Sequence, residues 1–458
     1  MKNICIQGLG FVGSAMSVAV ASQINKNNEP IFNVVGIDRS TNQGIDRIDK
    51  INSGLFPFQT NDESLNVELK KAVKRGNILA TNDISCFSKA EIVLVSINCD
   101  LVITNGSEKV ALKPFVTSLT QIAENISEDT LVIIESTVPP GTCEKIIYPM
   151  FKSIFKKRKL DIKKFFLAHS YERVMPGKDY LSSILNYWRV FAGINEESAI
   201  KCENFFKKII NIKEYPLSRL KNIISSECGK VLENSYRAVN IAFMEEWGRF
   251  AEEAEIDLFE VIDAIRLRPT HQNMRQPGFG VGGYCLTKDP LFAKIASKDI
   301  LQLSGHDFPF STKAVALNKE MPKVSFDKIK FYFKGKTKNK KILLLGVSYR
   351  EDVGDTRYSP SEVFFKEAKK NGAIVNAYDP FVSFWEELNL ALEPSLPEPN
   401  KFDVILFAVP HKQFRQLDIT VWMNNKNPLI FDANNVLTKK QINQIKAENY
   451  NFMSIGRG

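Results

Sequence analysis

The sequence lacks the residue patterns of metal-binding and disulfide-rich proteins. Its 458 residues include only four histidines and seven cysteines, with no CxxC pair and no Cys/His ligand spacing. We therefore expect no metal site. An odd number of dispersed thiols is typical of a reducing compartment, so the sequence favours a cytoplasmic protein.

Long apolar runs are also missing. No segment approaches the roughly 18 uninterrupted apolar residues that a membrane span needs. The N-terminal stretch MKNICIQGLGFVGSAMSVAVA has the lysine and apolar run of a secretory signal, but glycines at positions 8, 10 and 13 interrupt it. Hydrophobic residues make up 44% and charged residues 25% of the chain, which is typical of a globular protein and excludes disordered and fibrous classes.

Negative charge is in deficit, and the formal net charge is +9. Many of the lysines lie in two runs, at 155–164 and 328–341. Neither run has a clear nucleic-acid motif, so we interpret them as solvated helix faces and a linker and expect no nucleic-acid partner. A positive field would still help to capture a small, doubly charged substrate.

What the sequence has is a repeated alternation of short apolar runs with helical patterns. Runs such as NICIQG, FNVVGID, EIVLVS and TLVIIES precede polar or glycine-containing turns in the first part, and KILLLG, FDVILFAV and PLIFDA do so in the last. Continuous apolar strands alternating with helices predict parallel sheets. A long helix is expected at 220–255. The expected class is α/β, with two doubly wound parallel-sheet domains (1–215 and 323–458) joined by a long central helix and a helical middle (216–322).

The turn GLGFVG predicts a dinucleotide site. Gly8, Gly10 and Gly13 match G-x-G-x-x-G between an expected strand and an expected helix, where the helix N-terminus can receive phosphates. Asp38 ends the next strand, at the position of a carboxylate that binds the adenosine ribose. This favours NAD over NADP, although the neighbouring Arg39 leaves NADP open.

The stretch PGFGVGGYCLTKDP places one thiol after a glycine-rich loop. Glycines at 278, 280, 282 and 283 suit a backbone that approaches a ligand closely, and Cys285 follows them. Most cysteines that form no disulfide are buried and have a structural role only. Lys288 would lower a thiol pKa toward the reactive range, and Asp289 would serve as a base or orient water, which favours a nucleophile.

Further polar residues lie where a site is expected. Lys230 and Asn234 are four residues apart on the long helix and share one side of it, where they would stabilise a developing oxyanion. Thr137 lies in ESTVPPGT, and Glu172 and Arg173 lie in HSYERVMPGK, each beyond an expected strand. Taken alone, each of these turns has the polarity of an ordinary loop.

Together these motifs resemble the UDP-glucose/GDP-mannose dehydrogenase family, over nearly the whole chain. They occur in family order: GLGFVG, ESTVPPG, ER..PG, E..K...N, GVGGYCLTKD and G..Y....D.R.SP. The resemblance implies two Rossmann-like domains and a dimer through the helical region. It also implies oxidation of a nucleotide-sugar C6 alcohol to a carboxylate with NAD, for cell-surface polysaccharide precursors. The domain at 1–215 would bind NAD, and the domain at 323–458 would bind the nucleotide sugar.

The resemblance also implies roles for individual residues. The implied catalytic residues are Cys285, Lys230, Asn234, Asp289, Thr137 and Glu172. The implied cofactor-binding residues are Gly8, Gly10, Phe11, Val12, Gly13, Asp38, Arg39, Ser136 and Lys288. The implied substrate-binding residues are Glu172, Arg173, Lys230, Asn234, Arg268, Phe279, Gly280, Gly282 and Arg357. In the implied mechanism Cys285 attacks a C6 aldehyde, and the thiohemiacetal is oxidised to a thioester that water cleaves.

Departures from the family pattern point to one branch. Pro176 stands where the glucose branch has a second glutamate, which resembles the branch acting on N-acetylhexosamines. Tyr171 replaces a usual proline, VSINCD replaces V-P-T-P after the fourth strand, and Arg350 replaces a lysine. Alternatives are UDP-glucose or GDP-mannose as substrate, a one-step hydroxyacid or 6-phosphogluconate-type dehydrogenase, and a silent NAD-binding protein.

Overall fold

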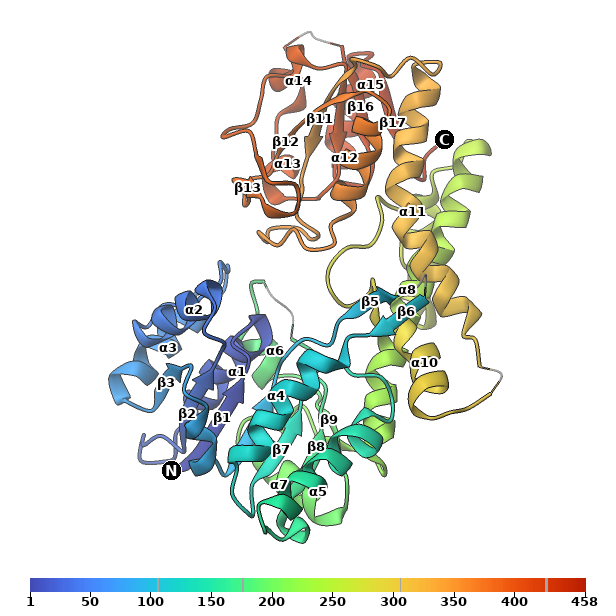
Figure 1. Cartoon of the computed structure of the whole chain (residues 1–458). Helices are drawn as coiled ribbons and strands as arrows, with labels where there is room; N and C mark the ends of the chain where they lie inside the picture. Colours follow the sequence, from blue (N-terminus) through green and yellow to red (C-terminus); the bar gives the residue numbers. More distant parts are fainter. Residues whose placement is uncertain (105–106, 175–176, 305, 425–426) are drawn as a thin grey trace. The chain divides into compact units, whose positions relative to one another are not determined.

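The computed structural model describes residues 1–104, 107–174, 177–304, 306–424 and 427–458. The chain forms two compact units (Figure 1). The first comprises residues 1–233 and 292–307, and the second comprises residues 234–291 and 308–458. The long helix α8 (Ile223–Glu253) contains the point where the first unit gives way to the second along the chain. The middle of the sequence is therefore divided between the two units.

The first unit is built on an eight-stranded sheet of order β10-β9-β8-β7-β4-β1-β2-β3. Neighbouring strands are parallel except β8 and β9, which are antiparallel. The strands are β1 (Lys2–Gln7), β2 (Phe32–Ile37), β3 (Ile78–Thr81), β4 (Ile92–Val95), β7 (Leu131–Ile134), β8 (Phe166–His169), β9 (Val190–Gly193) and β10 (Ser218–Arg219). A separate antiparallel pair, β5 (Leu101–Thr104) and β6 (Ser107–Val110), follows β4 and was not expected from the sequence.

Both faces of this sheet are covered by helices, which explains its fully apolar strands. On β7, Leu131 and Ile133 belong to one core cluster while Val132 and Ile134 belong to another, because successive side chains point to opposite faces. The first cluster includes side chains of α1 (Phe11–Ala21), α2 (Asn42–Asn52), α3 (Glu63–Arg75), α6 (Ser182–Leu185) and α7 (Glu196–Phe206). The second includes side chains of α4 (Leu112–Asn125) and α5 (Tyr148–Lys157).

The second unit contains a five-stranded parallel sheet of order β12-β11-β15-β16-β17. Its strands are β11 (Lys341–Leu345), β12 (Ile374–Tyr378), β15 (Val404–Phe407), β16 (Leu429–Asp432) and β17 (Phe452–Ser454). Its helices are α12 (Pro360–Lys370), α13 (Lys412–Arg415), α14 (Ile419–Met423) and α15 (Lys439–Ala447), and a short hairpin joins β13 (Phe384–Trp385) to β14 (Leu390–Ala391). On β11, Ile342 and Leu344 pack on one face, and Leu343 and Leu345 on the other.

Strand order reverses once in each sheet. The chain adds β2 and β3 on one side of β1 and then places β4 on the other, and it does the same with β12 and β15 around β11. Ligands of open α/β sheets bind beyond the carboxyl ends of the strands at such reversals. The fold therefore offers one position of this kind in each unit, after β1 and after β11.

The helical part of the second unit packs through small side chains. Helix α11 (Pro309–Tyr332) contacts the second half of α8, where Ala238 and Ala242 cluster with Ala314. The amide of Asn318 donates a 3.1 Å hydrogen bond to the carbonyl oxygen of Ala238. The other helices of the middle segment are α9 (Leu258–Arg266) and α10 (Phe292–Ile295).

The expected α/β class, the two sheets, of which the second is parallel and the first parallel except for β8 and β9, and the long helix are confirmed. Within the described ranges, no helix is long and apolar enough to cross a membrane.

Candidate active site

The turn between β1 and α1 has the shape that a phosphate requires. Gly8 has φ of +92°, and a Cβ there would lie 2.9 Å from the carbonyl oxygen of Ser96. A Cβ on Gly13 would overlap the carbonyl oxygen of Gly8. Around Gly10, by contrast, nothing but its chain neighbours lies within 4 Å of where a Cβ would stand. Gly8 and Gly13 are therefore needed for packing, while Gly10 leaves the main chain open to a pyrophosphate at the start of α1.

The start of α1 is held by aromatic contacts. Phe11 stacks on Phe58 with ring centroids 4.0 Å apart, and its carbonyl oxygen accepts a 2.6 Å hydrogen bond from the Tyr180 hydroxyl. Val12 follows in the first turn of the helix. The backbone expected to meet the phosphates is thus tied to two other segments of the first unit.

Asp38 follows β2 and is buried, but its carboxylate already has protein partners. Oδ1 accepts the backbone N–H of Arg39 at 2.8 Å, and Oδ2 forms a 2.8 Å ion pair with Nε of Arg47 on α2. The side chain of Asp38 is 6% exposed. A carboxylate has about four lone-pair sites, so a ribose hydroxyl can still be accommodated. Arg47 was not expected from the sequence.

A buried ion pair connects the strand ends beside this turn. Glu135 follows β7, pairs with Arg189 and accepts a 2.9 Å hydrogen bond from Ser96. Burial raises the pKa of Glu135, and Arg189 opposes that shift. The hydroxyl of Ser136 donates to the carbonyl oxygen of Ile97 at 2.5 Å. The unusual segment VSINCD is therefore anchored to the residues that follow β7.

The turn that carries Thr137 is fixed by Glu227, near the start of α8. Both oxygens of the Glu227 carboxylate accept backbone N–H groups, from Gly141 at 2.6 Å and Cys143 at 2.8 Å. Burial raises the pKa of Glu227 to about 7, although these two hydrogen bonds lower it. Thr137 itself is partly exposed at the edge of this turn.

His169 joins the same region from β8. Its Nδ1 lies 2.8 Å from the hydroxyl of Ser226 on α8, and its Nε2 lies 3.4 Å from the carbonyl oxygen of Ser136. The imidazole is fully buried, and burial lowers its pKa from 6.5 to about 3. A neutral imidazole therefore links β8, the turn after β7 and α8.

Lys230 and Glu172 are brought together in the first unit. The ammonium of Lys230 donates to the carbonyl oxygen of Glu172 at 3.0 Å and lies 3.7 Å from its Oε1. Lys230 is 6% exposed, which is rare for a lysine and indicates a specific environment. Arg173 points to a different partner and forms a 3.1 Å ion pair with Glu233 of α8.

Asn234, Asp289 and Lys288 form a buried cluster in the second unit. The amide nitrogen of Asn234 donates to Oδ2 of Asp289 at 2.7 Å, and Lys288 pairs with Oδ1 at 2.6 Å. The amide oxygen of Asn234 accepts no hydrogen bond from any described residue, although it is buried. Lys288, which was expected to meet the cofactor, is therefore engaged by the neighbouring carboxylate.

Cys285 lies in this cluster's loop and is partly exposed. Its carbonyl oxygen accepts backbone N–H groups from Asp289 at 2.9 Å and Lys288 at 3.3 Å, which closes a turn around the thiol. All seven cysteines lie in the described part of the chain, and none forms a disulfide.

The glycines before Cys285 are in close contact with other residues of the second unit. A Cβ on Gly282 would lie 2.7 Å from Pro360 and 2.8 Å from Tyr349, and one on Gly280 would lie 3.2 Å from Pro322. Gly278 is in contact with Asn434 in the same way. The loop was expected to approach a ligand. The structure shows that its glycines are also required because neighbouring residues of the second unit leave no room for a Cβ.

Three family models match successive parts of the chain. They describe the NAD binding, central and UDP binding domains of the UDP-glucose/GDP-mannose dehydrogenase family, over residues 2–210, 224–320 and 343–439. The chain belongs to this family. It is an NAD-dependent nucleotide-sugar dehydrogenase, and therefore an oxidoreductase.

Individual relatives of this dehydrogenase agree with that result. The UDP-N-acetyl-D-mannosamine dehydrogenase of Methanocaldococcus jannaschii is 30% identical over 445 residues, covering 96% of this chain and 93% of the relative. The UDP-glucose 6-dehydrogenase of Rickettsia conorii is 26% identical, covering 87% of this chain and 90% of the relative. The solved structure of UDP-D-ManNAc dehydrogenase from Pyrococcus horikoshii has a TM-score of 0.83 at 25% identity, covering 100% of this chain and 99% of that one.

The remaining predicted residues of the dehydrogenase differ in their surroundings. Arg268 is exposed after α9, and Arg357 forms a two-bond pair with Asp355 at 2.6 and 2.9 Å. Phe279 is 2% exposed and packs against Phe364, so its ring belongs to the core. Pro176 lies outside the described residues.

Five residues of the site, four of them buried and Arg47 partly exposed, were missed from the sequence. They are Arg47, Glu135, His169, Arg189 and Glu227. Three of them stand in motifs that the sequence shows: Glu135 in ESTVPPGT, His169 in HSYERVMPGK and Glu227 in E..K...N. Glu135, Arg189 and His169 have partners that are distant along the chain, whereas Arg47 pairs with the nearby Asp38.

Proposed function

We propose that this dehydrogenase oxidises the C6 hydroxyl of a UDP-N-acetylhexosamine to the carboxylate. The preferred candidate substrate is UDP-N-acetyl-D-mannosamine. The relative of that name at 30% identity over nearly the full chain supports the substrate. The observation that supports this chemistry is the buried cluster of Asn234, Asp289 and Lys288. Asp289 and Lys288 belong to the turn that holds Cys285, and Asn234 contacts Asp289 from α8. A single oxidation to an aldehyde would not need a thiol.

Cys285 is the proposed nucleophile. C6 loses a proton and a hydride to become an aldehyde, and the Cys285 thiolate adds to it to give a thiohemiacetal. Loss of a second hydride and a proton gives a thioester, and water then cleaves the C–S bond, which releases the carboxylate and returns the thiolate. A hydride acceptor for both oxidations is the chemistry that NAD supplies when bound.

Buried polar groups are proposed to support these steps. Lys230 and Asn234 stabilise the oxyanion, since both are nearly fully buried and an interaction with charge is stronger away from water. Asn234 also has a buried amide oxygen that a substrate hydroxyl would satisfy. Asp289, Thr137 and Glu172 are the proposed groups for activating water.

The ligand-binding residues follow the same proposal. Gly8, Gly10, Phe11, Val12, Gly13, Asp38, Arg39, Ser136 and Lys288 are proposed to bind NAD. Glu172, Arg173, Lys230, Asn234, Arg268, Phe279, Gly280, Gly282 and Arg357 are proposed to bind the nucleotide sugar. The open space at Gly10 and the burial of Asp38 support the first set most strongly.

The decisive experiment counts NADH released per sugar consumed across a panel of UDP- and GDP-sugars. The proposal expects two NADH per UDP-N-acetyl-D-mannosamine, no uronate from Cys285→Ser, and normal product from the control Cys228→Ser. One NADH per sugar, or uronate formed at the normal rate by Cys285→Ser, would overturn the thioester mechanism. Preferred turnover of UDP-glucose or GDP-mannose would overturn the substrate, and NAD binding without turnover of any sugar would favour a silent protein.

We also propose a homodimer that works in the cytoplasm and supplies a polysaccharide precursor. Helix α8 supports the dimer, because Phe243, Trp247 and Phe250 are 51%, 47% and 56% exposed along it. Trp247 contacts both phenylalanine rings, with centroids 6.4 and 5.9 Å apart. The ranges matched by the family models support the proposed domains at 1–215, 216–322 and 323–458.

A further inference from the structure

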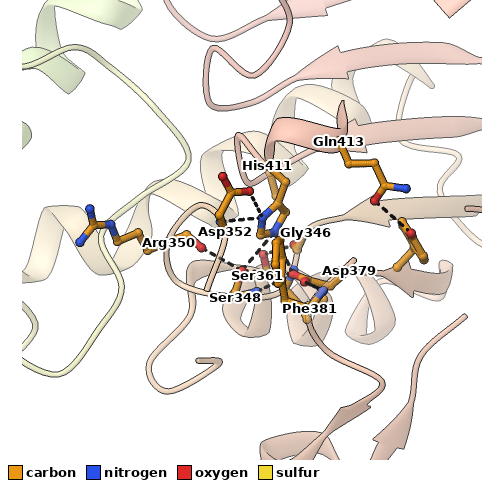
Figure 2. A network of polar contacts seen from close by, with 12 residues as sticks. Gly346, Ser348, Arg350, Asp352, Ser361, Asp379, Phe381, His411 and Gln413 are labelled. Carbon is orange, nitrogen blue, oxygen red and sulfur yellow. Dashed lines mark hydrogen bonds and ion pairs between the residues drawn. The ribbon is translucent and has the colours of Figure 1, made fainter. Parts of the chain in front are cut away.

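A buried polar network lies at the carboxyl edge of the second sheet (Figure 2). Ser348, Asp379 and His411 follow β11, β12 and β15, and all three are buried. Ser348 Oγ lies 3.1 Å from both Asp379 Oδ2 and His411 Nε2, and these two atoms are also 3.1 Å apart. The network therefore connects three strand ends at the reversal of strand order.

The hydrogen bonds define the orientation of the imidazole. The backbone N–H of Asp352 donates to Nδ1 of His411 at 2.9 Å. Nδ1 must then have a lone pair, which places the ring proton on Nε2, facing Asp379 and Ser348. With that proton directed at this pair, the Ser348 hydroxyl can donate its own proton elsewhere.

The network holds the backbone on both sides of Tyr349. The N–H of Ser348 donates to Asp379 at 3.0 Å, and the Ser348 hydroxyl reaches the carbonyl oxygen of Arg350 at 3.0 Å. The N–H of Tyr349 donates to the carbonyl oxygen of Asp355 at 2.9 Å. In Figure 2 the guanidinium of Arg350 points away from the network. Three consecutive residues are thus fixed by main-chain contacts.

The ring of Tyr349 packs on the loop before Cys285. Gly283 has φ of +81°, and a Cβ there would lie 2.8 Å from two ring carbons of Tyr349. The carbonyl oxygen of Gly283 accepts a 2.9 Å hydrogen bond from Thr287, which closes the turn containing the thiol. Burial raises the pKa of Tyr349, and the neighbouring Asp355 raises it further, while Arg350 lowers it.

We propose that Tyr349 is a positioning residue for Cys285, and that the Asp379–Ser348–His411 network fixes Tyr349. Tyr349 packs against the backbone of Gly282 and Gly283. This contact restricts the loop and therefore fixes the position of the Cys285 thiol. The inference rests on the proposed role of Cys285 as nucleophile. It also explains why residues of the UDP binding region contact the loop of a thiol that reacts with the sugar.

The test measures alkylation of Cys285 by iodoacetamide in the full chain, with Cys228 in the same molecule as an exposed internal reference. Peptide mass spectrometry gives the two rates in wild type, Tyr349→Phe and Tyr349→Ala. Loss of the ring should raise the Cys285/Cys228 rate ratio at least about five-fold, because the loop then opens locally. Tyr349→Phe, which keeps the ring, should stay within about two-fold of wild type.

Controls separate positioning from general loss of structure. Tyr332→Ala removes an aromatic ring at the end of α11, where it contacts Phe333, and should leave the ratio unchanged. Melting temperatures identify variants that fold. If Tyr349→Ala does not fold, His411→Gln takes its place and should raise the ratio at least about two-fold. An unchanged ratio in the folded variant, or an equal rise in Tyr349→Phe, would overturn the proposal.

This assay needs neither NAD nor sugar. Its failure would concern the position of the thiol, whereas uronate formation by Cys285→Ser would concern the chemistry. In the folded Tyr349→Ala variant we also expect kcat to fall more than KM for the nucleotide sugar rises, because the ring supports the thiol.

Discussion

The side-chain amide of Asn234 donates a 2.7 Å hydrogen bond to the carboxylate of Asp289, and the two residues are 1% and 0% exposed. Asp289 is one of the few buried carboxylates of the second unit, and its other oxygen pairs with Lys288. Removal of the amide would leave a buried charge with one partner fewer, which carries a cost in stability and in site geometry.

Asn234→Ala should therefore lose activity without losing cofactor binding. We expect kcat to fall about 100-fold or more, as for the removal of an oxyanion donor, and stability to fall by about 1–3 kcal/mol. Steady-state kinetics and urea unfolding measure the two effects. The control is Glu246→Ala, an exposed position on the same helix, which should change kcat less than about two-fold. Equal kcat in Asn234→Ala and the control would contradict the assigned role.

Asp38 should determine the preference for NAD. In Asp38→Ala the proposed carboxylate partner of the ribose is lost, while Arg47 remains without its ion-pair partner and Arg39 stays next to the site. We expect the Kd for NAD to rise about 10-fold and the preference over NADP to shrink or reverse. Titration calorimetry with each cofactor measures both constants. Asp46→Ala, an exposed residue of α2, serves as control, and an unchanged Kd for NAD in Asp38→Ala would refute the assignment.

His169 should make the protein sensitive to acid. Its pKa is about 3 in the folded state against 6.5 for an ordinary histidine, because the imidazole is buried. The unfolded chain therefore binds the proton first, so the stability from this group is present above pH 6.5 and is lost as pH falls toward 3. At pH 4 the loss amounts to about 3 kcal/mol.

His169→Asn removes the titration while keeping a polar atom near the Ser226 hydroxyl. Its melting temperature should depend less on pH between 6.5 and 4 than that of wild type. His271→Asn carries the same substitution at a partly exposed site and should follow the wild-type curve. Parallel curves for His169→Asn and wild type would show that His169 is not responsible.

The aromatic face of α8 should mediate self-association. Trp247→Glu places a charge between Phe243 and Phe250, which a buried interface disfavours strongly. Light scattering after gel filtration should report half the wild-type mass, while Glu246→Gln, the neighbouring exposed residue, keeps it. A wild-type protein that is already monomeric, or a Trp247→Glu variant of unchanged mass, would disprove the proposed interface.

Local patterns in the sequence were sufficient for the fold class and for selecting many of the residues proposed for the site. The apolar strands, the turn with Gly8, Gly10 and Gly13, and the helix that bears Lys230 and Asn234 depend on residues close together along the chain. Their periodicity and spacing are visible without tertiary contacts. The glycine loop before Cys285 was recognised for the same reason.

Tertiary structure decided which of these residues have which partners. Glu135 pairs with Arg189 because strand order brings their segments together, and no local pattern specifies such a pairing. Asp38 pairs with Arg47 through the local fold of the segment from β2 to α2. From the sequence, Gly283 was interpreted as backbone that approaches a ligand. In the structure it has a positive φ, and the ring of Tyr349 occupies the space that a Cβ would need. The sequence by itself determined where main chain must be free of side chains. Only packing between distant segments decided what occupies that space, because steric contact depends on distance in space and not along the chain.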